Sequence, residues 1–116
     1  MRYLLLLRGA EAEFVDRPQE ALESEVAFLS RFEDELAMSS ELEWSEVLGS
    51  DAQVEFVSPG GLEESERPQS AGAPLRRIWA IRVENEARAL ALAGELADGV
   101  AARIEVRECL ASSQRP

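Results

Sequence analysis

The chain has 116 residues, of which 46% are hydrophobic and 30% are charged, a balance typical of one globular domain and not of a disordered segment. It contains no histidine and no lysine, and 12 arginines face 23 acidic residues, which gives a formal charge of −11. A field of this sign repels phosphate backbones, so we expect no nucleic-acid partner.

The negative charge is concentrated in the first half of the chain. Residues 1–58 hold 14 acids and 4 arginines, a net charge of −10, whereas residues 59–116 hold 9 acids and 8 arginines, a net charge of −1. Two interpretations stay open: a solvated acidic helix face, which we favour, or a docking surface for a basic protein partner.

Cysteine content and apolar runs indicate the compartment. Cys109 is the single cysteine, so no disulfide forms within the chain, which suits a reducing cytoplasm. The apolar run Tyr3–Leu7 is shorter than a signal peptide requires, and no stretch approaches the roughly 20 apolar residues of a membrane span. We expect a cytoplasmic protein that does not contact a membrane.

The first half of the chain predicts a strand, a helix and two further strands. Residues 2–8 form a short apolar strand. Asp16 is the expected helix N-cap, Pro18 falls in the first turn, and the helix ends around Met38. Its apolar stripe comprises Leu22, Val26, Leu29, Phe32 and Leu36, widened by Phe28. Alternation over 41–48 and 53–57 predicts the two strands, and Ser58–Gly61 ends the second.

Residues 59–75 carry three glycines and three prolines and predict a flexible loop, either simply mobile or a lid over a site. The strand over 76–84 then places Ile78, Ala80 and Arg82 on one face and Trp79, Ile81 and Val83 on the other. The second helix follows. Its signals are Asn85 as N-cap, the stripe Leu90, Ala93 and Leu96 or Ala97, and Gly99 as the residue that stops it.

A last strand over 102–109 completes one domain over residues 1–110, and residues 111–116 form a disordered tail. This order predicts an α+β fold, a ferredoxin-like βαββαβ subunit with a short extra strand. Both helices would cover one sheet face. The other face, with part of Tyr3–Leu7 and with Trp44, would be too apolar to stay in water, so we expect a second copy to cover it in a homodimer with a barrel-like core.

Three stretches, "MRYLLLLRGAE", "FEDELAMSSELEWSEVL" and "IWAIRVENEARALALAGEL" leading to "IEVREC", resemble in order and spacing the YCII-related family, in particular its DGPF-type branch. The resemblance implies a dimeric α+β barrel and a tie to transcription regulation, because DGPF-type proteins often occur with extracytoplasmic-function sigma factors. The chain departs from the family pattern. Only Pro68 of the DGPF motif survives in "SERPQSAG", and the family histidine falls on or near Val26, eight residues before the matching aspartate position, Asp34.

Without histidine, a general base must be a perturbed carboxylate. Asp34 is the candidate, against the simpler interpretation of a solvated residue in an acidic run. Arg76 and Arg77 could clamp a ligand anion, or guard the strand edge against aggregation. Arg82 needs an acidic partner if its face is buried, Glu105 or Glu43, and a structural ion pair competes with a ligand clamp.

Trp44 and Trp79 could stack on an aromatic ligand, although strand tryptophans more often anchor a core or an interface. Neither metal-ligand spacing nor a phosphate-binding glycine loop is present, so we expect no metal and no cofactor.

Three functions stay open. The first is a non-catalytic YCII-related dimer that binds a small ligand or a protein partner, with a link to transcription regulation. The alternative is a divergent enzyme, lyase-like or isomerase-like, that acts on a small aromatic or lactone-like molecule with Asp34 as base. A pocket with Asp34 pointing into it would favour that enzyme, and Asp34 pointing to solvent would count against it. The third is a purely structural dimer.

Overall fold

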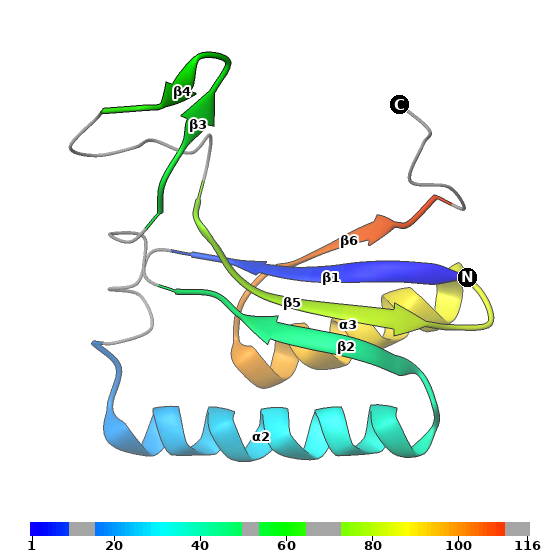
Figure 1. The fold of residues 1–116 in the computed structure, drawn as a ribbon. Coiled ribbons are helices and arrows are strands. Elements are labelled where there is room, and N and C mark those ends of the chain that lie inside the picture. The colour runs from blue at the N-terminus through cyan, green and yellow to red at the C-terminus, as the bar shows by residue number, and fades with distance from the viewer. Residues whose placement is uncertain (10–15, 50–53, 65–72, 111–116) are drawn as a thin grey trace.

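The computed structural model describes residues 1–9, 16–49, 54–64 and 73–110 (Figure 1). In these residues six strands and two helices follow one another: β1 (Arg2–Arg8), α2 (Gln19–Met38), β2 (Leu42–Val47), β3 (Val57–Ser58), β4 (Gly61–Leu62), β5 (Leu75–Arg82), α3 (Glu86–Val100) and β6 (Ile104–Glu108). The predicted tail 111–116 and the loop around Pro68 lie outside the described residues.

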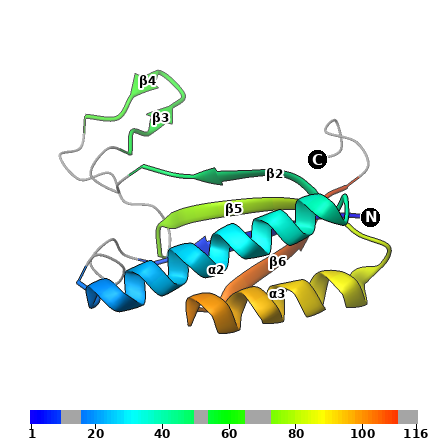
Figure 2. The same cartoon turned by 90° about the horizontal axis from the view of Figure 1, so that it is seen from below.

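Four of the strands form one antiparallel sheet in the order β2-β5-β1-β6, with β1 and β5 in the centre. Both helices lie on the same side of this sheet (Figure 2). The predicted α+β class is therefore confirmed, and the strand order is compatible with a ferredoxin-like fold.

The two central strands alternate between the two sheet faces. Trp79 and Ile81 of β5 are fully buried beneath the helices, beside Leu5 of β1 and Leu96 of α3, in one core cluster. This confirms the predicted face of β5. We call the face turned away from the helices the open face; its apolar residues are Leu4, Leu6, Trp44, Ile78 and Ala80.

Helix α2 begins later and is rotated relative to the prediction. Pro18, not Asp16, occupies the N-cap position, and no side chain caps the helix. Leu29, Phe32 and Leu36 are buried as expected, but Val26 is 64% exposed. The inward face passes through Glu25 instead of Val26.

Helix α3 begins as predicted but ends differently. The Asn85 side chain accepts a hydrogen bond from the backbone N–H of Arg88, at 2.9 Å, as an N-cap does. The helix continues through Gly99 to Val100, and Ala101 takes the left-handed conformation, with φ of 50°. The stop predicted at Gly99 is wrong, and Leu90 of the predicted stripe is exposed.

Gly99 has a packing reason instead. A Cβ atom there would meet the Phe28 ring of α2 at 2.1 Å. Phe28 itself stacks on Phe32, with 5.8 Å between ring centroids. The glycine therefore allows α2 and α3 to approach closely.

A small hairpin stands on the far side of the sheet from the helices (Figures 1 and 2). Strands β3 and β4 pair across Pro59 and Gly60, and Gly60 has a φ of 107°, as the third residue of a type II turn requires. Of the predicted strand over 53–57, only Val57 lies in a strand among the described residues, as the start of β3. Within the predicted loop 59–75, Gly61–Leu62 form strand β4, because the glycines allow the chain to reverse and pair.

An ion pair joins Glu41, the residue before β2, to Arg88 of α3. The Arg88 guanidinium donates from Nε and Nη2 to the two carboxylate oxygens of Glu41, each at 2.9 Å. The hydrogen bond from Arg88 lowers the pKa of Glu41 below its usual value of 4.5. Separately, neither described helix is long and apolar enough to cross a bilayer.

Two glycines of α3 form a matched test of helix packing. Gly94 has open space where a Cβ would stand, whereas Gly99 faces Phe28. We expect Gly94→Ala to raise the free energy of unfolding by about 1 kcal/mol, through helix propensity. Gly99→Ala must displace Phe28, so it should be about 1–3 kcal/mol less stable than Gly94→Ala in urea denaturation. Equal gains in the two variants would contradict the close contact.

The Glu41–Arg88 pair predicts a pH-dependent contribution to stability. Since the folded-state pKa of Glu41 is lowered, its contribution is complete above pH 4.5 and is lost as the pH falls through the folded-state value. At pH 7 we expect Glu41→Gln to lower the free energy of unfolding by about 0.5–1 kcal/mol, a gap that narrows below pH 4.5. The exposed Glu84→Gln is the control, and a gap independent of pH would count against this assignment.

Candidate functional site

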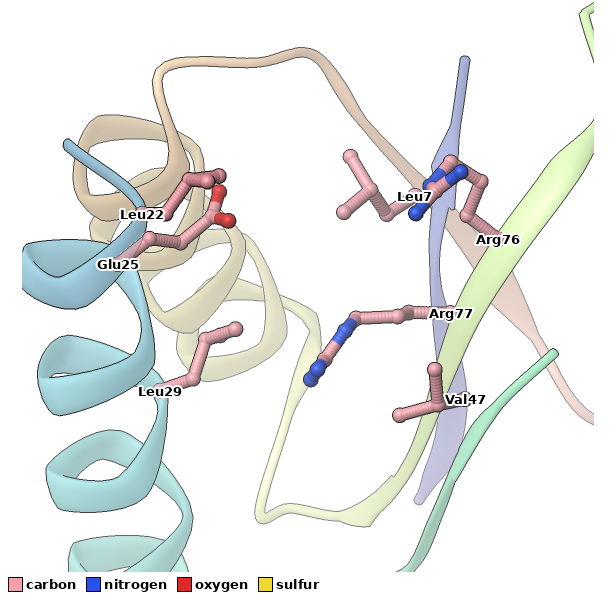
Figure 3. A pocket seen from close by; sticks show the side chains of 7 residues that line it. All are labelled: Leu7, Leu22, Glu25, Leu29, Val47, Arg76 and Arg77. Carbon is pink, nitrogen blue, oxygen red and sulfur yellow. The ribbon is translucent and has the colours of Figure 1, made fainter. Parts of the chain in front are cut away.

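A cavity of about 280 Å³ lies between the N-terminal half of α2 and the sheet (Figure 3). Apolar side chains from α2, β1 and β2 form most of its wall, and charged side chains complete it. The lining residues are Leu7, Leu22, Glu25, Leu29, Val47, Arg76 and Arg77.

The register of α2 sets one wall of the cavity. Leu22, Glu25, Leu29, Phe32 and Leu36 follow one another at spacings of three and four, which keeps them on one side of the helix. The first three reach the cavity, and the last two continue into the core.

An irregularity in the sheet sets the opposite wall. Leu7 pairs with Arg77 and the next residue, Arg8, pairs with Leu75, so Arg76 is an extra residue in β5. Regular alternation would place Arg76 and Arg77 on opposite faces. The extra residue re-aims the side chains locally, and both arginines line the same cavity.

Glu25 carries the acidic side of the cavity. Its Oε2 atom lies 2.6 Å from Nη2 of Arg17, in an ion pair whose side chains are 16% and 26% exposed. Its other oxygen, Oε1, is buried and has no hydrogen-bond partner in the described residues. A charged acceptor left unsatisfied in this way is costly, so it favours a ligand that donates a hydrogen bond.

Arg77 carries the basic side. Its guanidinium carbon lies 6.0 Å from the centre of the Trp79 ring, within the range of a cation–π contact. Figure 3 shows its side chain extending from β5 across the cavity towards α2. In the described part of the chain no carboxylate pairs with Arg77, whereas Arg76 already has an interaction of its own.

The two tryptophans lie in different environments. Trp79 is fully buried, and its indole N–H donates to Oε1 of Glu33 at 2.8 Å, so its ring is part of the core below the cavity. Trp44 lies on the open face and is 42% exposed, away from the cavity.

Arg82 forms a structural ion pair. Its Nε donates to Oε1 of Glu43 at 2.8 Å, and Arg2 donates to Oε2 of the same carboxylate at 2.9 Å. These hydrogen bonds, that from Arg82 first, lower the pKa of Glu43. Glu43 is thus the partner of Arg82; the other expected partner, Glu105, is engaged by Arg107 and Arg8.

The positions that match the family dyad face outward. Val26 and Asp34 are both exposed on α2, and neither lines the cavity. Asp34 therefore does not have the position that the enzyme hypothesis requires.

Within the described ranges, neither a metal-binding cluster nor a cysteine in the cavity is present. No three cysteine, aspartate or glutamate side chains there gather closely enough to hold a metal ion. Cys109 is half-buried just after β6 and does not line the cavity.

Glu25 is the functional residue that sequence reasoning missed. The signal was present, because the regular spacing of 22, 25, 29, 32 and 36 passes through it. Because the predicted stripe included only apolar residues, it contained Val26 and omitted the charged Glu25.

Comparison of the chain with protein-family models and with curated proteins finds no match. The relation to the YCII-related family therefore stays a prediction.

Proposed function

We propose that this chain is a small-molecule-binding protein that works as a homodimer and uses no catalytic residue of its own, as a YCII-related protein without the family histidine would. The observation that carries the proposal is the cavity, whose wall combines four apolar side chains with an arginine that reaches across it. Small-molecule sites are mostly apolar with a few polar groups that orient the ligand, and this volume is near the lower end of their range.

Binding is favoured over catalysis by the placement of the acidic groups. A general base must come within hydrogen-bond reach of its substrate, and Asp34 is exposed outside the cavity. Glu25 does line it, but one of its carboxylate oxygens already pairs with Arg17. A link to transcription regulation is supported by the resemblance alone.

The homodimer is supported by the composition of the open face. Leu4 and Ile78 are half-buried and Trp44 is 42% exposed, in a row of apolar side chains that no described helix covers. Ion pairs flank this row: Arg2 and Arg82 with Glu43 on one side, and Arg8 and Arg107 with Glu105 on the other. An apolar centre with a charged rim is the usual anatomy of a protein interface, and two such faces can stack at about 10 Å.

We expect the purified protein to have twice the mass of one chain in sedimentation equilibrium. Ile78→Glu places a charge in the centre of the open face and should produce monomers, because a buried unpaired carboxylate is strongly unfavourable. Leu90→Glu, at an exposed apolar position on α3, is the matched control and should remain dimeric. A monomeric parent protein would refute the dimer.

Ligand binding is tested by thermal stability against a panel of small neutral and acidic compounds: phenols, aromatic acids and lactones. A ligand at about 100 times its dissociation constant should stabilise the folded state by roughly 2.7 kcal/mol. Leu22→Trp, which fills the cavity mouth, should abolish the stabilisation, whereas Val26→Trp, on the exposed side of the same helix, should keep it. Asp34→Asn should also keep it.

Two results would contradict this function. If no compound stabilises the parent protein, the cavity is not a ligand site. If Asp34→Asn alone abolishes the effect, the enzyme hypothesis regains its base.

A further inference from the structure

Three charged side chains, those of Glu25, Arg76 and Arg77, line the cavity, and no ion pair joins Glu25 to Arg77. Glu25 projects from α2 and Arg77 from β5, and Figure 3 shows both reaching into the space between these elements. Glu25 pairs with Arg17, which does not line the cavity, and not with Arg77. A ligand could therefore meet both groups at once.

Arg77 favours an anionic group on the ligand. Its guanidinium presents several N–H donors in a planar fork that matches a carboxylate, and the described residues supply it with no carboxylate. The Trp79 ring attracts the positive charge of the Arg77 guanidinium. This contact accepts no hydrogen bond, so the N–H donors of Arg77 stay available to a ligand.

Glu25 favours a donor at another point of the ligand. The buried Oε1 accepts no hydrogen bond in the described residues, although a carboxylate oxygen has room for two. A hydroxyl group of the ligand that displaces the side chains covering this oxygen would satisfy it with a charge-assisted hydrogen bond. The Glu25 carboxylate also disfavours a ligand of high negative charge, as does the net charge of −11.

Between these two points the wall is apolar. Its apolar lining residues are Leu7, Leu22, Leu29 and Val47, which pack best against a hydrocarbon part of a ligand. A volume of about 280 Å³ limits that part to a small ring or a short chain.

We infer that the cavity binds a small hydroxy acid with a single negative charge, its carboxylate against Arg77, its apolar body between α2 and the sheet, and its hydroxyl against Oε1 of Glu25. The inference rests on the proposed function and adds the ligand class and the two residues that select it.

The test uses three compounds that share one benzene ring, 4-hydroxybenzoate, benzoate and phenol, titrated into the full chain by calorimetry. We expect 4-hydroxybenzoate to bind at least about tenfold more tightly than phenol, which lacks the carboxylate, since a hydrogen bond to a charged group contributes this much. Benzoate, which lacks the hydroxyl, should bind several-fold more weakly than 4-hydroxybenzoate.

Two variants assign the selectivity to residues. Arg77→Met keeps a long apolar side chain and should reduce the affinity for 4-hydroxybenzoate to that for phenol, while phenol binds as before, which shows that the cavity is intact. Glu25→Gln should reduce the preference for 4-hydroxybenzoate over benzoate. Arg31→Met removes the same charge from an exposed position on α2 and should leave all three affinities unchanged.

The outcomes distinguish a wrong ligand class from a wrong proposed function. Equal affinity for phenol and 4-hydroxybenzoate, or a ratio that Arg77→Met does not change, would overturn the ligand class and leave the cavity as a site for neutral compounds. The ligand class would also be overturned if other compounds of the panel bind but 4-hydroxybenzoate, benzoate and phenol do not. Failure of every compound in both experiments would overturn the proposed function itself.

Discussion

The structure depends on the packing of β5 against two helices. Trp79 and Ile81 are fully buried on that side, and the Trp79 indole finds its hydrogen-bond acceptor, Glu33, on α2. A buried indole N–H without an acceptor would be energetically unfavourable, so the hydrogen bond to Glu33 fixes the distance between α2 and the sheet. The indole ring itself fills the core. Because α2 is held there along its C-terminal half, its N-terminal half stands over the sheet edge without a tryptophan to fill the space beneath it, and that is where the cavity lies.

The same strand explains why the two faces of the sheet differ in character. On the helix side apolar side chains meet apolar side chains, and among the described residues no charged residue is buried as a whole, although Glu25 and Glu33 turn a carboxylate towards the sheet. On the open face, arginines and glutamates at the strand ends pair with each other and shield part of the apolar row between them, as long charged side chains often do.

Much of the fold could be predicted from local patterns. Alternation identified the faces of β5, and Asn85 marked the start of α3, because both signals act over a few neighbouring residues. The errors occurred where distant segments decide. Gly99 looked like a helix stop, but it accommodates Phe28 from α2, and Val26 looked buried although the heptad-like spacing of the inward face selects Glu25. Hydrophobicity alone misassigns a helix face when a paired carboxylate takes an inward position.

Composition and the periodicity within single elements were enough to predict the α+β class, the negative net charge and the lack of a histidine base. The sequence also indicated Arg76 and Arg77 as candidate anion-binding residues. Only the tertiary structure decided that both arginines line one cavity, that Asp34 lies outside it and that Glu25 lies within it. The physical reason is that an extra residue in β5 and the rotation of α2 about its axis are set by contacts between elements, and these contacts exist only once the helix and the sheet have packed together.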